Sequence, residues 1–526
     1  MYKYIKKNSF QNIMLIIITC MWAGINVFSS IVLSWLLDSL TSKSWKMFIL
    51  WAVVDIFCWL IYSFFQMIKD TYKEKIIQKQ LNDIRSDLLN EISSLSHLEF
   101  STRVYSEYQS WLINDMNLLR ENGFLQIYAA VESVITIILN SVAIIYFHWS
   151  LLLFTILLTF FVYISPKFFQ KRIDTITSNL SDNLSFTLDR VEDYFKGYNI
   201  FYFHGKLQYF RKEILSFFEK QISSRIELTM YSSLANAISM VASIISQVIL
   251  FIVSGYLIIK SIVSVGVIFS IANLSSSIFN YTRGAAYNIV TAKAANKILN
   301  KYPNEKHHSD IRKLKQIEKF NDSILFNNVR VKFSNGHFIS FPNLKINKGE
   351  KIAVVGESGA GKSTLIKLLL GVVSPYDGEI LIDGIRYEDI DHESKITLFN
   401  YLEQKPYLLK ENLSMNLFID KSTTIDFNNN LFRNSAFDFI KHHLDDEDTR
   451  NLSEGQKSRV ALLRELLDEK DILLVDEGTA SLDYKNSIEV ERLILNIPDK
   501  TVIFVTHVLH EDTSNLFDKI IRMESK

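Results

Sequence analysis

Long apolar runs crowd the chain up to about residue 300, and beyond that point short apolar stretches alternate with polar turns. A bilayer core requires about 20 mostly apolar helical residues for each crossing. Six segments meet that length and predict six membrane spans, at residues 13–37, 48–67, 125–147, 151–168, 234–259 and 265–289. The first of these runs is too long for the apolar region of a signal peptide, which indicates a retained span.

The connections between the predicted spans differ in length and charge. Lys3, Lys6 and Lys7 precede the first span and favour a cytoplasmic N-terminus. Six crossings then return the chain to the cytoplasm, and the outer connections at 38–45, 148–149 and 260–264 are short. The inner connections at 69–123 and 171–231 are long and charged, and each is typical of a helix, a turn and a second helix that extends beyond the bilayer.

The last part of the chain has the pattern of an α/β domain. Residues 351–355, 379–382, 472–475 and 501–505 are short apolar runs that predict strands, and residues 363–372 predict a helix. The polar stretch 300–319 predicts a linker. We therefore expect an all-α six-helix transmembrane domain at 1–300, a linker at 301–320 and an α/β domain at 321–526.

Charge and cysteine content exclude several classes of protein. Lys and Arg total 57, and Asp and Glu also total 57, so the formal net charge is zero. A basic nucleic-acid-binding surface is therefore not expected. Both cysteines, Cys20 and Cys58, lie inside apolar runs, which supports neither a disulfide framework nor a zinc cluster.

A complete phosphate-binding loop lies between a predicted strand and a predicted helix. Its residues are Gly356, Glu357, Ser358, Gly359, Ala360, Gly361, Lys362, Ser363 and Thr364. The glycines let backbone N–H groups surround phosphates, and the helix N-terminus adds positive potential. Lys362 is expected on the β- and γ-phosphates and Ser363 on Mg²⁺, so ATP and Mg²⁺ are the predicted ligands.

Two carboxylates follow the predicted strand 472–475. A carboxylate at the C-terminal end of a strand lies at the crevice where open α/β sheets bind ligands. Asp476 is expected to hold Mg²⁺ through water, and Glu477 to orient and polarise the attacking water. A strand followed by Asp-Glu is a weak signal alone and a strong one beside a phosphate loop.

The stretch Leu452-Ser453-Glu454-Gly455-Gln456 resembles the signature motif of ATP-binding cassette (ABC) proteins. Other positions match the same family in the expected order: Phe333 the aromatic that stacks on adenine, Gln404 the glutamine that senses Mg²⁺ and the membrane domain, Ser481-Leu482-Asp483 the loop at the dimer interface, and His507 the switch histidine. The resemblance covers nearly all of residues 324–526.

The resemblance implies that two cassettes sandwich ATP. One cassette would contribute Phe333, Lys362, Ser363, Gln404, Asp476, Glu477 and His507, and the other Ser453, Gly455 and Gln456. Glu477, His507 and Gln404 are then the expected catalytic residues, Ser363, Gln404 and Asp476 the expected metal-site residues, and Asp483 part of the ATP site. Glu454 stands where the family usually has glycine. Residues 446–450 lack the Glu-Arg-Gly sequence that usually precedes the signature motif in this family.

Six spans before a cassette resemble the half-transporters of the exporter class. The resemblance places coupling helices near 97–105 and 197–205, where they would dock on the cassettes. In the sixth span, Asn273, Ser277 and Asn280 recur at helical spacing with Arg283 and Tyr287. Polar groups in lipid are expensive, so this face is predicted to line a substrate path, with a polar helix–helix seam as the alternative. Asp55 and Glu132 could select cationic cargo or pair with a neighbouring helix.

These patterns predict a multi-pass exporter of a bacterial plasma membrane, with the nucleotide-binding domain in the cytoplasm. Its expected partners are a second copy of itself or a related half-transporter, the lipid bilayer and an exported substrate. A small or modified peptide is the first expectation for that substrate, because the residue usage resembles low-GC Gram-positive bacteria; no peptidase domain is expected before the first span. The alternatives are a multidrug or lipid exporter, an ATP-gated sensor or channel that transports nothing, and an inert partner of a second half-transporter.

Overall fold

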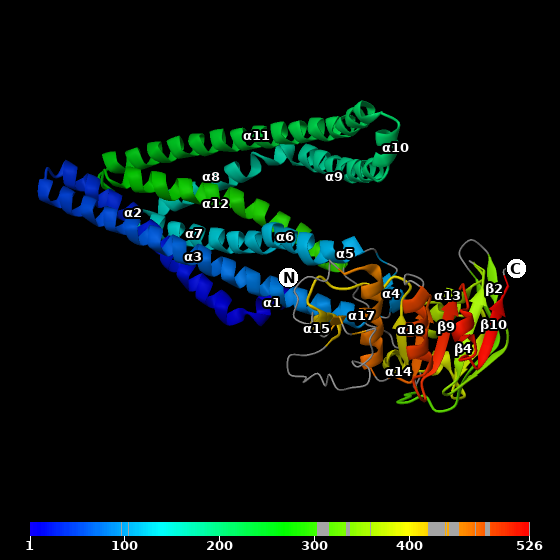
Figure 1. The fold of residues 1–526 in the computed structure, drawn as a ribbon. Coiled ribbons are helices and arrows are strands. Elements are labelled where there is room, and N and C mark those ends of the chain that lie inside the picture. Colours follow the sequence, from blue (N-terminus) through cyan, green and yellow to red (C-terminus); the bar gives the residue numbers. More distant parts are fainter. Residues whose placement is uncertain are drawn as a thin grey trace. The chain divides into compact units, whose positions relative to one another are not determined.

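The computed structural model describes residues 1–95, 97–101, 103, 105–301, 315–332, 337–357, 359–418, 437, 439–440, 452–468, 470–478 and 484–524. The chain divides into two compact units. The helical unit comprises Met1–Glu91 and Tyr105–Asn304, and the second unit comprises Ile92–Val104 and Glu305–Lys526. Figure 1 shows that the first unit is built of long helices and that the second contains the strands.

The helical unit consists of long helices joined by short turns. These helices are α1 (Tyr2–Lys7), α2 (Ser9–Thr41), α3 (Trp45–Ser93), α7 (Leu125–Phe147), α8 (Trp149–Ile164), α9 (Lys167–Lys196), α10 (Tyr198–Phe203), α11 (Leu207–Ile259) and α12 (Val267–Asn296). Between α3 and α7 lie the shorter elements α4 (His97–Ser101), α5 (Tyr105–Ser110), α6 (Met116–Leu118) and the π-helical turns η1 (Trp111–Asp115) and η2 (Leu119–Phe124), and η3 (Lys297–Lys301) follows α12.

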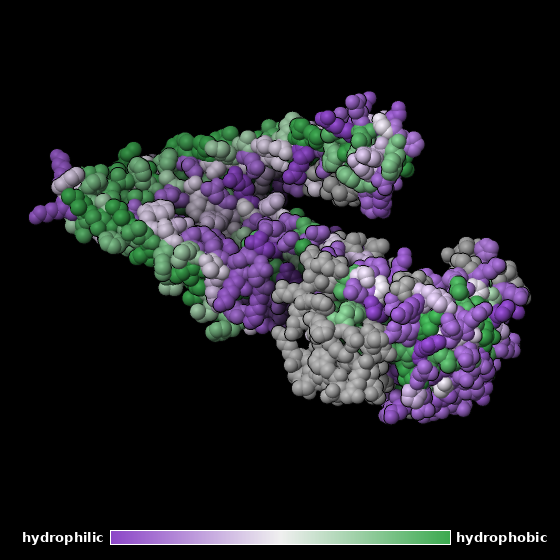
Figure 2. Space-filling model, viewed as in Figure 1, coloured by the Kyte–Doolittle hydropathy of each residue, from purple (hydrophilic) through white to green (hydrophobic). Residues whose placement is uncertain are grey.

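Within the part of the chain that the structure describes, five helices are long and apolar enough to cross a membrane. They are Ser9–Thr41, Trp45–Ser93, Glu107–Phe147, Trp149–Thr177 and Leu207–Ile259. A shared core lies where α7, α8, α11 and α12 meet, and includes Ile144, Leu151, Leu250 and Ile271. Large apolar side chains also cover the outside of these helices, and Figure 2 shows hydrophobic residues spread over α2, α3 and α11. A surface of this kind is suited to lipid.

The sixth predicted span forms a helix but is not one of the five. Its residues belong to α12, whose polar positions Asn273, Ser277 and Asn280 lower the mean hydropathy of the segment. Packing compensates, because α12 lies against α2, α7, α8 and α11 and buries Leu274 and Phe279. Hydropathy alone therefore identifies five spans, and α12 completes the bundle through its contacts.

The predicted inner connections are helical hairpins. Helices α9 and α11 run side by side and are joined by α10 (Figure 1), at the position predicted for the second coupling helix. The short helix α4 lies at the position predicted for the first, and the segment that contains it is grouped with the second unit. Docking of α4 and α10 on cassettes stays a prediction.

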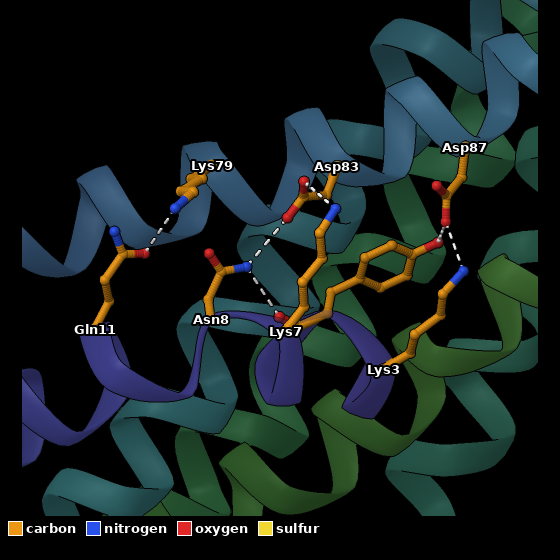
Figure 3. A network of polar contacts seen from close by, with 8 residues as sticks. Lys3, Lys7, Asn8, Gln11, Lys79, Asp83 and Asp87 are labelled. Atoms are coloured by element: carbon orange, nitrogen blue, oxygen red, sulfur yellow. Dashed lines mark hydrogen bonds and ion pairs between the residues drawn. The ribbon is translucent and has the colours of Figure 1, made fainter.

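A charged network attaches α1 to the polar extension of α3, as Figure 3 shows. The ammonium group of Lys3 lies 2.7 Å from Asp87, and that of Lys7 lies 2.7 Å from Asp83. Asn8 also donates to the carboxylate of Asp83, at 3.1 Å. Lys3 and Lys7, which favour a cytoplasmic N-terminus, therefore also hold α1 against α3.

A buried ion pair connects α3 with α7. The ammonium group of Lys69 lies 2.9 Å from Glu132 Oε1, although only 2% of the Lys69 side chain is exposed. The same ammonium lies 3.4 Å from the ring centroid of Trp22 in α2. Glu132 is therefore paired with a neighbouring helix, which was one of the two expectations for this carboxylate.

The second unit contains two sheets. One is antiparallel, in the order β2 (Phe338–Ser340), β1 (Ser323–Lys332), β5 (Asp377–Ile382), β6 (Ile385–Arg386), with β3 (Leu344–Asn347) also paired with β1. The other is parallel, in the order β10 (Lys519–Met523), β4 (Lys351–Gly356), β9 (Thr501–Thr506), β8 (Ile472–Asp476), β7 (Phe399–Leu402). Every residue of β8 is buried, as expected for a central parallel strand.

Helices complete this unit, and the parallel pairing of the strands leaves their carboxyl ends at one edge of the sheet. They are α13 (Lys362–Leu369), α14 (His392–Leu398), α15 (Leu413–Asn416), α17 (Glu454–Leu467), α18 (Tyr484–Leu495) and α19 (Glu511–Ser514), with the short η4 (Tyr387–Asp389). Apolar residues from β4, β8, β9 and α13 share one core, which includes Ile352, Leu365, Leu474 and Ile503. The structure thus has the predicted helical transmembrane and α/β parts.

Candidate functional site

The phosphate loop joins β4 to α13, and its backbone requires glycine. Gly361 caps α13 at φ +91°, and a Cβ added there would lie 2.8 Å from Ile339 Cγ2. A Cβ at Gly356 would lie 2.3 Å from the carbonyl oxygen of Met523. Neither position has room for a side chain. The left-handed backbone at Gly361 is a second reason for glycine there.

Lys362 is folded back into this loop. Its side chain is only 4% exposed. The ammonium donates to the carbonyl oxygens of Gly356 and Glu357, at 2.9 Å each, and lies 3.3 Å from His507 Nδ1. A buried cation that is held by neutral acceptors is suited to an anionic ligand arriving at the same loop.

Ser363 and Asp476 form the second contact of the site. The Ser363 hydroxyl donates to Asp476 Oδ1 at 2.9 Å, which joins the first turn of α13 to the end of β8. Burial raises the pKa of Asp476 above its usual range, although the Ser363 hydrogen bond and nearby lysines lower it. A hydroxyl and a carboxylate oxygen are hard ligands that could hold Mg²⁺ together with substrate phosphates and water.

Glu477 is held at the centre of the site. Its backbone lies in the left-handed region at φ +53°, where its N–H donates to the carbonyl of Val505 at 3.0 Å. One carboxylate oxygen lies 2.7 Å from His507 Nε2, and the other accepts from Gln404 Nε2 at 2.6 Å. A left-handed non-glycine residue beside such partners is typical of functional sites.

The signature stretch forms the start of α17. Ser453 is the N-cap, its hydroxyl accepts from the backbone of Gln456 at 3.2 Å, and the Gln456 side chain accepts from the backbone of Ser453 at 2.8 Å. The side chain of Glu454 is 72% exposed and lies 2.7 Å from Lys457. The residue that replaces the family glycine therefore points to solvent. An acidic residue is also favourable in the first turn of a helix.

The structure brings together most of the predicted ATP-site residues. Lys362, Ser363, Gln404, Asp476, Glu477 and His507 form one connected cluster. Thr364 and Ala360 belong to the same loop and helix, with Ala360 buried. Phe333, Ser358 and Asp483, together with residues 446–450, lie outside the described residues.

The predicted polar face of α12 is split between two environments. The side chains of Asn273 and Asn280 are exposed, whereas Ser277 accepts a hydrogen bond from Asn140 of α7 at 3.1 Å. Ser277 thus makes a helix–helix contact of the kind expected for a seam. Asp55, the other carboxylate considered for cargo, accepts from Ser29 at 2.5 Å.

Sequence reasoning missed the direct contact between Lys362 and His507. These residues are 145 positions apart, and no local spacing signals that they meet. Their meeting follows from the pairing of β4 with β9, since the phosphate loop and His507 each follow one of these adjacent parallel strands. Only the order of the strands in the sheet could have predicted the contact between Lys362 and His507.

A nucleotide-binding α/β unit fused to a helical membrane unit defines an ATP-binding cassette transporter. Residues 12–282 match the family described as the ABC transporter transmembrane region, and residues 340–480 match the family described as ABC transporter. The first match alone covers more than half of the chain, so the protein belongs to the ABC transporter family.

Several curated proteins resemble this chain over part of its length. The lactococcin transport/processing ATP-binding protein LcnC-like of Lactococcus lactis subsp. lactis (strain IL1403) is 35% identical over 176 residues, which is 32% of this chain and 24% of that protein. The mesentericin-Y105 transport/processing ATP-binding protein MesD of Leuconostoc mesenteroides is 31% identical over 217 residues, which is 39% of this chain and 29% of that protein. The chain thus spans about a quarter to a third of these relatives.

A solved structure resembles the whole chain. It is described as a bacterial Atm1-family ABC exporter with ATP bound, and it matches with a TM-score of 0.78 at 17% identity. The match covers 98% of this chain and 93% of that one. The likeness establishes the fold of an ABC exporter for both units.

Proposed function

We propose that this protein is an ATP-driven exporter that hydrolyses ATP in its second unit and moves a substrate through its helical unit. The observation that carries the proposal is the position of the Glu477 carboxylate, between Gln404 and His507 and next to the Ser363–Asp476 pair. This cluster lies at the carboxyl ends of β8 and β9, where open α/β sheets bind ligands.

The roles of the residues follow from their contacts. The buried ammonium of Lys362 would leave its carbonyl acceptors and bind the terminal phosphates of ATP. Ser363 and Asp476 would hold Mg²⁺, which when bound supplies positive charge to the phosphate oxygens. Glu477 would polarise the attacking water, and Gln404 and His507 would hold its carboxylate in place.

The signature residues Ser453, Gly455 and Gln456 support a site shared between two copies. Ser453 and Gln456 bond to each other within the first turn of α17, and Glu454 bonds to Lys457 of the same helix. A second copy that presents Ser453 to this loop would complete the site, as the family resemblance implies. We therefore propose a homodimer with two ATP sites, in a plasma membrane, with both cassettes in the cytoplasm.

A peptide is the substrate that the relatives favour. LcnC-like and MesD are named as transport/processing proteins for lactococcin and mesentericin, and ComA of Streptococcus pneumoniae, 30% identical over 235 residues, is named a transport/processing protein. We propose that this chain exports a small or modified peptide. Asn273 and Asn280, which are exposed in α12, are proposed to line its path, whereas Ser277 bonds to Asn140 of α7.

The test of the ATPase is Glu477→Gln in the full-length protein. An amide keeps the size of the side chain and cannot polarise water as a carboxylate does, so phosphate release should fall by at least about a hundredfold. ATP affinity should remain, since Lys362 and Ser363 are unchanged. Glu388→Gln, an exposed change in η4, is the matched control. Near-normal phosphate release by Glu477→Gln would remove Glu477 from its proposed role.

A further inference from the structure

A buried carboxylate links α18 to the start of α19, the helix that follows His507 in the chain. Glu491 in α18 is only 3% exposed. One of its oxygens lies 2.9 Å from His510 Nδ1, and the other accepts from the Thr513 hydroxyl at 2.6 Å. Thr513 is fully buried, so its hydrogen bond to Glu491 forms away from water, whereas the side chain of His510 is 17% exposed. We call Glu491, His510 and Thr513 the Glu491 cluster.

The surroundings of His510 fix its ring and its backbone. The ring of Tyr484, at the start of α18, lies edge-on to the imidazole, with 5.2 Å between the centroids and 90° between the planes. The carbonyl of His510 accepts from the backbone of Thr513 and of Ser514, because His510 is the N-cap of α19. Helix α18 and the start of α19 are therefore held as one piece.

Only two residues, Val508 and Leu509, separate this piece from His507. Strand β9 ends at Thr506, and His507, Val508 and Leu509 connect it to His510. At its other end the segment is fixed, since β9 lies between β4 and β8. A displacement of His510 must therefore be absorbed by a segment of three residues that contains His507.

His507 has little packing of its own to resist such a displacement. Its side chain is 41% exposed, whereas that of its partner Glu477 is 11% exposed. The 2.7 Å contact between His507 Nε2 and Glu477 thus depends on where the backbone holds the histidine. Small displacements of a catalytic contact can slow a reaction by up to about a hundredfold.

We propose that Glu491 and His510 are positioning residues for ATP hydrolysis, which act by holding the segment that carries His507 against Glu477. The inference rests on the proposed ATPase function and adds residues to it that no motif contains. Burial of a carboxylate is costly unless its hydrogen bonds are satisfied, and the two bonds of Glu491 select one arrangement of α18 and α19.

The variants separate the hydrogen bonds from the bulk of the side chains. His510→Leu and Glu491→Leu keep the volume and remove the bonds. His510→Asn and Glu491→Gln can still bond, because the asparagine amide donates near the place of Nδ1. In Glu491→Gln the amide oxygen accepts from Thr513 and the amide nitrogen donates to the other tautomer of His510. In full-length protein, both leucine variants should lower kcat about tenfold with little change in KM for ATP, and both conservative variants should recover most of it. Lys485→Gln, an exposed change in the first turn of α18, is the control.

A second measurement reports on His507 itself. Carbethoxylation of His507, followed by peptide mass spectrometry, should be faster in the two leucine variants than in wild type or the conservative variants. The contact with Glu477 protects the imidazole, and loss of the Glu491 cluster should weaken that contact. Adding His510→Leu to His507→Ala should also have no further effect on the residual rate, because the two residues act in one chain of contacts.

The outcomes distinguish this inference from the proposed function. If wild type hydrolyses no ATP, the proposed function fails. If wild type hydrolyses ATP while the leucine variants keep the wild-type kcat and the wild-type labelling of His507, the positioning role fails. If the leucine variants lose activity only in proportion to a lower thermal midpoint, with His507 labelled as in wild type, the cluster is structural and the inference is overturned.

Discussion

At the scale of single residues, the ATP site shows how function can oppose stability. Asp476 lies at the end of a strand that is buried throughout, and its carboxylate has one hydroxyl partner, Ser363. Burial raises its pKa, and the neighbouring Glu477 carboxylate raises it further. An ionised Asp476 is therefore unfavourable in the folded protein without a metal ion, and the proposed Mg²⁺ would make it favourable by supplying positive charge.

This electrostatic cost predicts the effect of Asp476→Asn on stability. A carboxyl whose pKa is raised on folding binds its proton more tightly in the folded state than in the unfolded state. Its contribution is therefore favourable at low pH and is lost as the pH rises from the unfolded pKa, about 3.9, through the higher folded pKa. Without nucleotide, Asp476→Asn should thus have a higher thermal midpoint than wild type at pH 7 to 8, with a smaller difference near pH 5.

The same variant should lose Mg²⁺-dependent ATP hydrolysis, since an amide oxygen is a weaker ligand than a carboxylate. Thermal unfolding in detergent, followed at several pH values without Mg²⁺, makes the measurement. Asp468→Asn, in an exposed ion pair with Lys470, is the control and should change the midpoint little at any pH. A lower midpoint for Asp476→Asn at pH 8 would show that ionised Asp476 stabilises the metal-free fold.

At the scale of elements, the long periodic segments were predictable and the irregular ones were not. The strands predicted at 351–355, 472–475 and 501–505 are β4, β8 and β9, because continuous apolar runs of that length fit a sheet covered on both faces. The predicted helix at 363–372 is α13, Lys362–Leu369. The π-helical turns η1 and η2 have no signature in local pattern, since their extra residue in each turn is set by packing with neighbouring helices.

The same limit applies to side-chain partners between helices. Glu132 was recognisable as an ionisable residue in a span, but nothing in the sequence identified Lys69 as its partner. Lys69 lies in α3 just beyond the segment predicted to cross the bilayer, where a lysine is unremarkable. Its near-complete burial against Trp22 and Glu132 depends on how α2, α3 and α7 pack together.

This pair predicts non-additive effects on the stability of the helical unit. Removing one partner of a buried ion pair leaves an uncompensated charge and costs about 3–5 kcal/mol. Lys69→Met and Glu132→Gln should therefore each lower the thermal midpoint, and the double variant should lower it less than either single variant. Lys73→Met, which breaks the more exposed pair with Asp70, is the control. Additive losses in the double variant would mean that the two side chains do not interact energetically.

At the scale of the whole molecule, the order of motifs was predictable and the assembly and cargo were not. Local motifs predict the phosphate loop, Asp476 and Glu477, and the family resemblance adds Gln404 and His507. The structure places these residues in one cluster. Parallel strands bring them together, because each motif follows a strand of the same sheet. The cargo has no such signal, since a transport path is formed by side chains from several helices whose relative placement no local pattern records.

Assembly can be tested through the separation of Ser453 from the other site residues. If Ser453 acts on the ATP of a second copy, a Lys362→Ala chain lacks its own phosphate loop but can still present a signature. A Ser453→Arg chain has the opposite defect, because the large cation replaces the N-cap hydroxyl of α17. In a mixed dimer one composite site would combine the intact phosphate loop of one chain with the intact Ser453 of the other.

Mixed dimers of Lys362→Ala and Ser453→Arg should therefore hydrolyse ATP at up to about half the wild-type rate if the two sites act independently. Differently tagged chains, co-expressed and purified through both tags, provide verified mixed dimers for an assay of phosphate release. Homodimers of each variant, prepared in the same way, set the background. Pairing Lys362→Ala with Glu477→Gln is the matched control, because both changes then lie on the same side of the shared site and neither composite site is intact. If the first mixture is no more active than the control mixture, the site does not draw Ser453 from a second copy.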